Sequence, residues 1–338
     1  DLRMSRGLGD VYKRQDLETL MQLIYLKLTN LTKDEKAVNN LINNQVTALA
    51  NRSNNPQAVF QDSLTSTLYP GNPVFRTMTV DEVKSVNYDR ALELGKQLFG
   101  NAKDYTFFFV GNFDEAKILP LIEQYIASLP NNGKKFKNVE TLPVKGEVVN
   151  KFTKAMENPQ DVAVEIWCSE APYTLRNSVL ADIAARVINM DYNRNIREKL
   201  SAAYYAGADA MESVKLDGKT MRVGVTGNAM MNPDKSKDAI PYFYSGLKDA
   251  MEQPNLDDLQ KVKEILLKQA DVSCKQNGYW MGVISEYLIH GIDTHTNYKK
   301  EVSSVDAKAV SDFLKNVVMK DGNHVEVIMH ATKAGEAK

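Results

Sequence analysis

The chain contains 338 residues, of which 25% are charged and 43% are hydrophobic, and its formal net charge is −1. This length is enough for two domains with separate cores, and the composition is that of an ordinary globular protein. The near-neutral charge provides no electrostatic basis for binding nucleic acid or an anionic membrane. No apolar run approaches the ~18 residues that a membrane span requires.

The first part of the chain is predicted to be mainly helical. Residues 1–15 lack apolar periodicity and end abruptly before a clean helix, so we expect them to be a non-native scar. Thr79 and Glu82 form a capping-box pattern that opens a short helical turn. The strongly apolar run 105–111 predicts a strand. Longer helices are predicted at 17–30, 33–51, 56–68, 87–98 and 114–127.

The second part mixes strands with helices. It follows residues 131–146, where Asn131, Gly133 and a lysine-rich run predict a linker. Strands are predicted at 148–156, 161–170, 202–213, 220–229 and 324–331, and helices at 174–192, 235–251, 256–274, 278–290 and 306–317. Of the two cysteines, Cys168 lies in an apolar run and is predicted to be a buried thiol, and Cys274 has no motif around it.

The two parts are related by an internal repeat. Residues 83–86 and 105–110 match residues 302–305 and 324–329 at an offset of 219, and the match rests on pattern and order. Upstream, 68–71 match 288–291 at an offset of 220. The strand-rich block 146–235 has no counterpart in the first copy, since that counterpart would precede residue 1. We therefore expect the first copy to lack roughly 90 residues of the unit, and the chain to be a piece of a longer protein.

No familiar catalytic motif is present. The sequence contains neither H-x-x-E-H nor G-x-S-x-G. The four histidines, His290, His295, His324 and His330, show no catalytic spacing, so surface or packing roles are favoured over zinc binding.

Arg197 and Tyr204 form the candidate site. They are seven residues apart, between a predicted helix and a predicted strand. A guanidinium and a phenol hydroxyl facing an open cleft could bind a carbonyl and the oxyanion that develops from it. In the alternative, Arg197 pairs with Glu198 or Asp191, and Tyr204 packs in the core. Spacing alone favours that alternative.

The segment 195–205, together with the element order and the segments 17–26 and 68–73, resembles the C-terminal half of the pitrilysin/insulinase family of zinc metallopeptidases. The resemblance implies an α+β fold of two related α/β domains, with mixed, mostly antiparallel sheets covered by helices and with the first domain incomplete. It assigns 16–130 to the third family domain and 147–338 to the fourth. In one departure from the family, Ser201-Ala202-Ala203 stand where members often have glycine before the tyrosine.

The resemblance also implies a function. Zinc and H-x-x-E-H would lie in the N-terminal half of the same polypeptide or in a zinc-bearing partner subunit, and this chain alone would be inactive and bind no zinc. Arg197 and Tyr204 would bind peptide substrates in a chamber between the halves. Two alternatives remain open: a naturally separate ligand-free subunit and a non-catalytic scaffold subunit. Bacterial relatives are often exported, so the periplasm or cell envelope is expected.

Overall fold

The computed structural model describes residues 17–131 and 136–333, so the predicted scar at 1–15 lies outside the described residues. The chain forms two compact units. The first comprises Asp1–Asn51 and Met78–Val139, and the second comprises Arg52–Thr77 and Glu140–Lys338. The second unit therefore takes one segment from within the first half of the chain.

The first unit is helical. Tyr125 donates a 2.9 Å hydrogen bond from its hydroxyl to Glu18 Oε1, and Met21 is fully buried. Thr79 and Glu82 form the predicted capping box at α4. The elements are α1 (Leu17–Thr29), α2 (Glu35–Asn51), α4 (Val80–Lys84), α5 (Tyr88–Phe99), η4 (Ala102–Asp104), α6 (Glu115–Leu121) and the π-helical turn η5 (Ile122–Ile126).

The prediction of a strand at residues 105–111 is wrong. Among the described residues, 105–110 take part in no strand ladder. The apolar composition favours a strand, but a strand also requires a neighbouring backbone with which to exchange hydrogen bonds.

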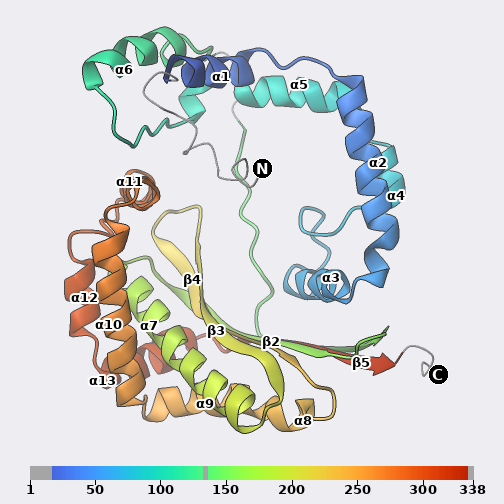
Figure 1. Cartoon of the computed structure of the whole chain (residues 1–338), viewed down its shortest axis with the longest axis vertical. Helices are drawn as coiled ribbons and strands as arrows, with labels where there is room; N and C mark the ends of the chain where they lie inside the picture. Colours follow the sequence, from blue (N-terminus) through green and yellow to red (C-terminus); the bar gives the residue numbers. More distant parts are fainter. Residues whose placement is uncertain (1–16, 132–135, 334–338) are drawn as a thin grey trace, which may run out of the picture. The chain divides into compact units, whose positions relative to one another are not determined.

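The second unit is built on one five-stranded sheet (Figure 1). The strands are β1 (Glu147–Met156), β2 (Asp161–Pro172), β3 (Ala203–Val214), β4 (Thr220–Met231) and β5 (Asn323–Lys333). Their order is β1-β5-β2-β4-β3, in which β1 and β5 are parallel and every other pair is antiparallel. This mixed, mostly antiparallel sheet with covering helices confirms the predicted α+β class.

One face of the sheet carries the main hydrophobic core. Fully buried Ile183, Ile188 and Phe243 pack there with Val225 and Leu314. The helices of this part are α7 (Leu175–Tyr192), α8 (Ser236–Ala239), α9 (Pro241–Glu252), α10 (Leu256–Ser273), α11 (Asn277–His290), α12 (Tyr298–Ser304), α13 (Ala307–Phe313) and the π-helical turn η7 (Leu314–Val318).

The opposite face is covered by α3 (Pro56–Leu68), which follows the short helix η3 (Arg52–Asn54) (Figure 1). Phe60, Leu64 and Leu68 pack in the second hydrophobic cluster, against Val164, Ile166, Cys168, Val325, Val327 and Met329. The buried Cys168 confirms the predicted buried thiol. The domain prediction placed α3 within residues 16–130, yet this helix lies on the sheet formed by residues of 147–338.

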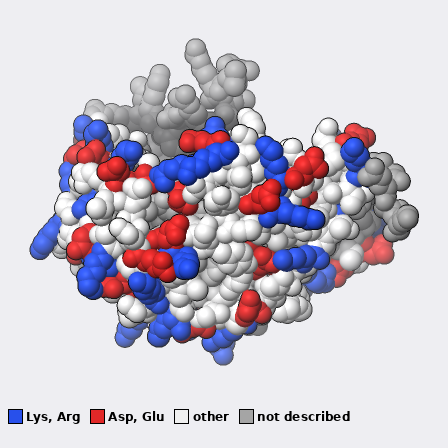
Figure 2. All heavy atoms as spheres, turned by 90° about the horizontal axis from the view of Figure 1, so that it is seen from below, with Lys and Arg blue, Asp and Glu red and all other residues white. Residues whose placement is uncertain are grey.

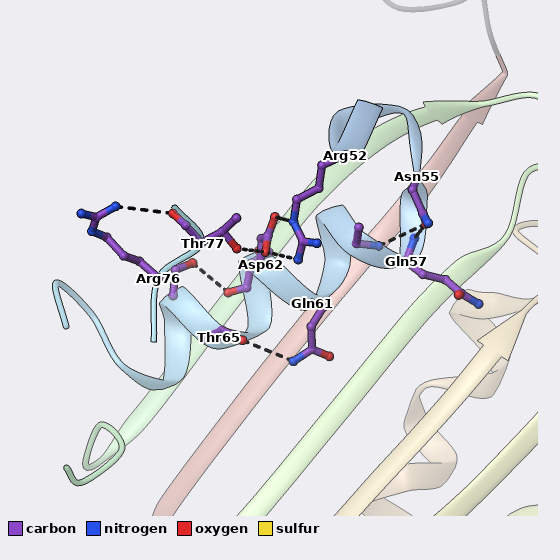
Figure 3. A network of polar contacts seen from close by, with 11 residues as sticks. Arg52, Asn55, Gln57, Gln61, Asp62, Thr65, Arg76 and Thr77 are labelled. Atoms are coloured by element: carbon purple, nitrogen blue, oxygen red, sulfur yellow. Dashed lines mark hydrogen bonds and ion pairs between the residues drawn. The ribbon is translucent and has the colours of Figure 1, made fainter. Parts of the chain in front are cut away.

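A polar network holds the segment around α3 in shape (Figure 3). Asp62 accepts hydrogen bonds of 2.7 and 2.6 Å from the Arg52 guanidinium and one of 2.6 Å from the Thr77 hydroxyl. Asn55 caps the helix by accepting from the backbone N–H groups of Gln57 and Ala58. The segment therefore closes on itself, since Arg52 and Thr77 stand at its two ends.

The element bounds reproduce the repeat. Adding 219 to the bounds of α5 gives 307–318, which is the span of α13 and η7. Adding 220 to the last residue of α3 gives Leu288, within the last turn of α11. Gly71 and Gly291, at equivalent positions after these helices, both have positive φ, of 69° and 74°.

The molecular surface has mixed charge. The face shown in Figure 2 carries lysine and arginine interspersed with aspartate and glutamate. Within the part of the chain that the structure describes, no helix is long and apolar enough to cross a bilayer.

Candidate functional site

Arg197 projects from a rigid continuation of α7. The π-helical segment η6 (Asn193–Lys199) extends this helix, and π-helical turns are frequent at functional sites. Tyr192 and Ile196 are fully buried beneath it, and the Tyr192 hydroxyl donates a 2.8 Å hydrogen bond to the carbonyl of Phe243. Arg197 is exposed and forms no hydrogen bond or ion pair with the residues described.

Side chains around Arg197 hold the segment in place. Arg194 forms an ion pair with the buried Asp258. Asp191 accepts a 2.9 Å hydrogen bond from Asn195, whose side-chain oxygen accepts a 2.9 Å bond from Lys199. Desolvation raises the pKa of Asp191, while Asn195 and Arg194 oppose this effect. Asp191 is thus engaged by Asn195 and Arg194, and the alternative in which Arg197 pairs with Asp191 or Glu198 is not formed.

A tight turn connects η6 to strand β3. Ser201 has φ of 47°, in the left-handed region that favours glycine. The backbone N–H of Ala202 donates to the carbonyl of Ile196 at 3.0 Å, and Lys235 Nζ donates to the carbonyl of Leu200 at 2.9 Å. Hydrogen bonds from Ala202 and Lys235 therefore hold the turn. Ser201, which stands where family members often have glycine, is the residue with the left-handed backbone conformation.

Tyr204 lies at a β-bulge. In the β3–β4 ladder Ala203 pairs with Met231 and Tyr205 with Met230, so Tyr204 is an extra residue with no partner of its own. Its side chain is 93% exposed, which rules out the core position of the alternative. A Cβ atom added to Gly207 would lie 2.8 Å from the Tyr205 hydroxyl oxygen, so that ring lies back over β3. The bulge thus turns Tyr204 outward while Tyr205 covers the strand.

Arg197 and Tyr204 are thus two side chains with uncommitted hydrogen-bond donors on one short, anchored segment. The guanidinium supplies up to five N–H donors and the phenol supplies one O–H. Donors held in place before a reaction can stabilise a developing oxyanion, because no reorganisation is needed. A cavity of about 680 Å³ lies nearby, but Arg194, Asp191 and Asp258 line it and Arg197 does not.

A buried polar cluster on the sheet was not predicted from the sequence. Glu165 is fully buried, and its Oε2 forms a 2.8 Å hydrogen bond with His324 Nε2. Glu326 accepts a 2.9 Å bond from Tyr244 and forms a 2.7 Å ion pair with Lys151. Burial raises the pKa of Glu165 to about 7, an effect that His324 opposes and Glu326 reinforces. The available signal in the sequence was Glu165 itself, a single acidic residue within the apolar run of this strand.

The histidines have structural partners. His324 stacks on Trp167 with ring centroids 5.1 Å apart, which agrees with the predicted packing role. His330 Nδ1 lies 2.8 Å from Asp161 Oδ2, and His295 Nδ1 lies 2.7 Å from the Tyr279 hydroxyl. Across residues 17–131 and 136–333, no group of three or more His, Cys, Asp or Glu side chains could hold a metal ion. The described residues therefore do not fit a zinc site.

Residues 85–266 match the family model described as Peptidase M16 inactive domain. The chain belongs to this family. The match confirms the predicted resemblance to the C-terminal, inactive half of pitrilysin-type metallopeptidases, and it covers both Arg197 and Tyr204.

Relatives named as zinc proteases support the same assignment. A "Zinc protease PQQL-like" protein of Arabidopsis thaliana is 23% identical over 79% of this chain, and the "Probable zinc protease PqqL" of Escherichia coli is 28% identical over 54%. The chain spans 29% and 20% of these two proteins.

Solved structures show the same fold. The periplasmic protease PqqL of E. coli superposes with a TM-score of 0.80 at 18% identity, over 95% of this chain and 35% of that chain. A peptidase M16 inactive domain from Pseudomonas fluorescens superposes with a TM-score of 0.72 at 13% identity, over 95% of this chain and 76% of that chain.

Proposed function

We propose that the chain is the zinc-free portion of a zinc-dependent endopeptidase and that Arg197 and Tyr204 bind the substrate peptide. The observation that carries the proposal is the outward, unpaired placement of both side chains on a segment whose neighbouring residues Arg194, Asn195 and Ala202 are held by ion pairs and hydrogen bonds. Arg197 has no partner among the described residues and Tyr204 is 93% exposed, so both are available to a ligand.

In this proposal the chain's residues act on the peptide carbonyl. The Arg197 guanidinium and the Tyr204 hydroxyl donate hydrogen bonds to the carbonyl oxygen and hold it as negative charge develops there. The metal-activated water belongs to another part of the protein, since the described residues form no metal-binding group. That part would be the N-terminal half of the same polypeptide or a partner subunit, and the substrates would be peptides or small unfolded proteins enclosed between the halves.

The bacterial relative of solved structure is called a periplasmic protease, and we propose the same compartment for this chain. The two alternatives of the sequence analysis, a separate ligand-free subunit and a non-catalytic scaffold, make different predictions for the site. In a scaffold, the removal of either side chain would leave peptide cleavage by the assembled protein unchanged.

The test is made in the complete enzyme that contains this chain. Arg197→Ala and Tyr204→Phe should each lower kcat by about 10²–10³, the usual effect of removing one oxyanion donor. Zinc content and thermal midpoint should stay the same, because neither side chain is buried. Tyr205→Phe and Arg90→Ala, which change a neighbouring tyrosine and an exposed arginine of the first unit, serve as controls. If all four variants have the turnover of the natural enzyme, the proposal is wrong.

A further inference from the structure

Another cavity, of about 550 Å³, lies between helices α7, α10 and α11. Its walls are largely apolar, since Val179 of α7, Leu266 of α10 and Val283 of α11 line it. The volume falls in the range of about 300–1,000 Å³ that is usual for ligand pockets. Neither Arg197 nor Tyr204 lines this cavity, so binding there is independent of the role proposed for that pair.

The sequence of α11 leaves the cavity open. Gly278 and Gly282 both line it, and their spacing of four residues places them on one face of the helix. A Cβ atom added to either glycine would have no heavy atom within 4 Å. Tyr279 of the same helix and Tyr298 of α12 supply aromatic walls. A larger side chain at position 282 would therefore occupy part of the cavity.

The cavity carries a surplus of negative charge. Asp182, Glu212 and Glu286 line it, whereas Arg186 is the one basic residue among the described residues that do so. Arg186 Nε donates a 2.6 Å hydrogen bond to Asp182 Oδ1, so these two charges are paired. Glu212 and Glu286 are left as the two carboxylates of the cavity without a cation.

The two remaining carboxylates are held by neutral hydroxyl groups. The Ser178 hydroxyl donates a 2.7 Å hydrogen bond to Glu212 Oε2, and the Tyr173 hydroxyl donates one to Glu286 Oε2. These bonds orient the carboxylates but do not neutralise them. Desolvation raises the pKa of Glu212, the bond from Ser178 opposes this effect, and the charges of Asp182 and Glu286 reinforce it. A bound cation would relieve the repulsion between these carboxylates.

Apolar walls and unpaired carboxylates together select one kind of ligand. A primary alkylammonium ion has a hydrocarbon stem for the apolar walls and a charged head with three N–H donors for the carboxylates. The rings of Tyr279 and Tyr298 also favour a cation, because the face of an aromatic ring is electrostatically negative. An anion would meet two like charges, and a neutral hydrocarbon would leave both carboxylates unpaired.

We infer that this cavity binds an alkylammonium ion, with its stem on the apolar walls and its charged head at Glu212 and Glu286. A free aliphatic amine and the lysine side chain of a peptide present the same chemistry. The two sources differ in size and in the number of charges, so binding measurements distinguish them.

Isothermal titration calorimetry of the 338-residue chain tests the inference with two probes, cadaverine and the blocked peptide acetyl-Ala-Lys-Ala-amide. Pentanediol and the Nε-acetylated peptide are the matched uncharged controls. At least one charged probe should bind at one site per chain, and its uncharged counterpart should bind at least ~10-fold more weakly, because hydrogen bonds to charged groups are lost. Tighter binding of cadaverine would identify a free amine as the ligand, and tighter binding of the peptide would identify a lysine side chain.

Variants of the lining residues locate the binding. Glu212→Gln and Glu286→Gln keep an acceptor oxygen and remove the charge, so each should weaken binding by ~10-fold. Gly282→Leu should abolish measurable binding without lowering the thermal midpoint, because leucine fills open space and favours the helix more than glycine does. Glu264→Gln changes an exposed glutamate of α10 that does not line the cavity, and it should bind like the natural chain.

Thermal midpoints establish that each variant is folded, and if a glutamine variant unfolds, Gly282→Leu decides alone. Failure of both charged probes to bind would overturn the inference. Equal binding of the charged and uncharged probes would do the same, since the carboxylates would then play no part. So would charged-probe binding that Gly282→Leu leaves unchanged, because the site would then lie elsewhere on the chain.

Discussion

His324 and Glu165 join strands β5 and β2 through a buried 2.8 Å contact between Nε2 and Oε2, although 159 residues separate them in the chain. Glu326 lies opposite Glu165 in the same ladder and is held by Lys151 and Tyr244. Desolvation raises the pKa of Glu326, but the hydrogen bonds from Lys151, Glu165 and Tyr244 outweigh it and keep that pKa below its ordinary value. The two carboxyl groups thus differ in proton affinity, and Glu165 is the one that binds a proton more tightly.

The first prediction concerns the pH dependence of stability. Burial raises the pKa of Glu165 from 4.5 to about 7, so the folded protein binds this proton more tightly than the unfolded chain does. The natural protein should therefore lose stability as pH rises from about 4.5 to about 7, and the loss should be complete above that range. Glu165→Gln cannot ionise, so its free energy of unfolding relative to the natural protein should rise by ~2 kcal/mol between pH 5 and pH 8.

Urea denaturation at pH 5, 6, 7 and 8 measures this difference. Glu252→Gln changes an exposed glutamate on α9, and its profile should run parallel to that of the natural protein. A Glu165→Gln profile that is also parallel would show that Glu165 titrates normally.

The second prediction concerns the close approach of β4 to β2. A Cβ atom added to Gly224 would lie 2.0 Å from the carbonyl oxygen of Trp167 and 2.7 Å from Cys168 Cα. Both neighbours are backbone atoms of a central strand, so they cannot move without disturbing the ladder. Gly224→Ala should lower the free energy of unfolding by ~3 kcal/mol or more. Gly282 in α11 has no atom within 4 Å of an added Cβ, and Gly282→Ala should stabilise the chain by ~0.5–1 kcal/mol through helix propensity. Thermal denaturation of both variants checks the pair, and equal effects would contradict it.

The third prediction concerns the turn before Tyr204. Ser201 has φ of 47°, which costs a residue with a Cβ atom about 1 kcal/mol. Ser201→Gly removes this cost, and because glycine has more freedom in the unfolded chain, the net gain in stability should be ~0.5 kcal/mol. Ser201→Val should lose at least ~1 kcal/mol, because branching at Cβ increases the clash. Denaturant midpoints of the two variants should therefore move in opposite directions, and movement in the same direction would mean that the backbone here is not strained.

Local sequence signals predicted the elements well. The helix at 56–68 begins and ends where predicted because Asn55 caps it and Pro56 suits its first turn. The strand at 161–170 is longer by two residues than predicted, and the helix at 17–30 is shorter by one. These elements carry their own caps or apolar periods, so no distant residue is needed to define them.

Other features depend on contacts that the sequence order hides. The apolar face of α3 shows that this helix packs on an apolar surface. The sequence of α3 does not specify that this surface is the sheet of the second repeat. The bulge at Tyr204 arises from pairing with β4, and the outward direction of Arg197 depends on the π-helical geometry of η6. The sequence therefore proposed Arg197 and Tyr204 as candidate site residues, whereas their exposure, which argues against a packing role, came from tertiary structure.

The position of β5 has a consequence for how the chain is made. This strand is the last element in sequence, yet it lies between β1 and β2, and among the described strands it is the only neighbour of β1. During synthesis on the ribosome, β1 and the apolar edge of β2 must therefore wait for residues 323–333 before they can pair with β5. Synthesis that stops before β5 would leave an exposed, aggregation-prone edge, so the appearance of β5 acts as the checkpoint for forming the sheet.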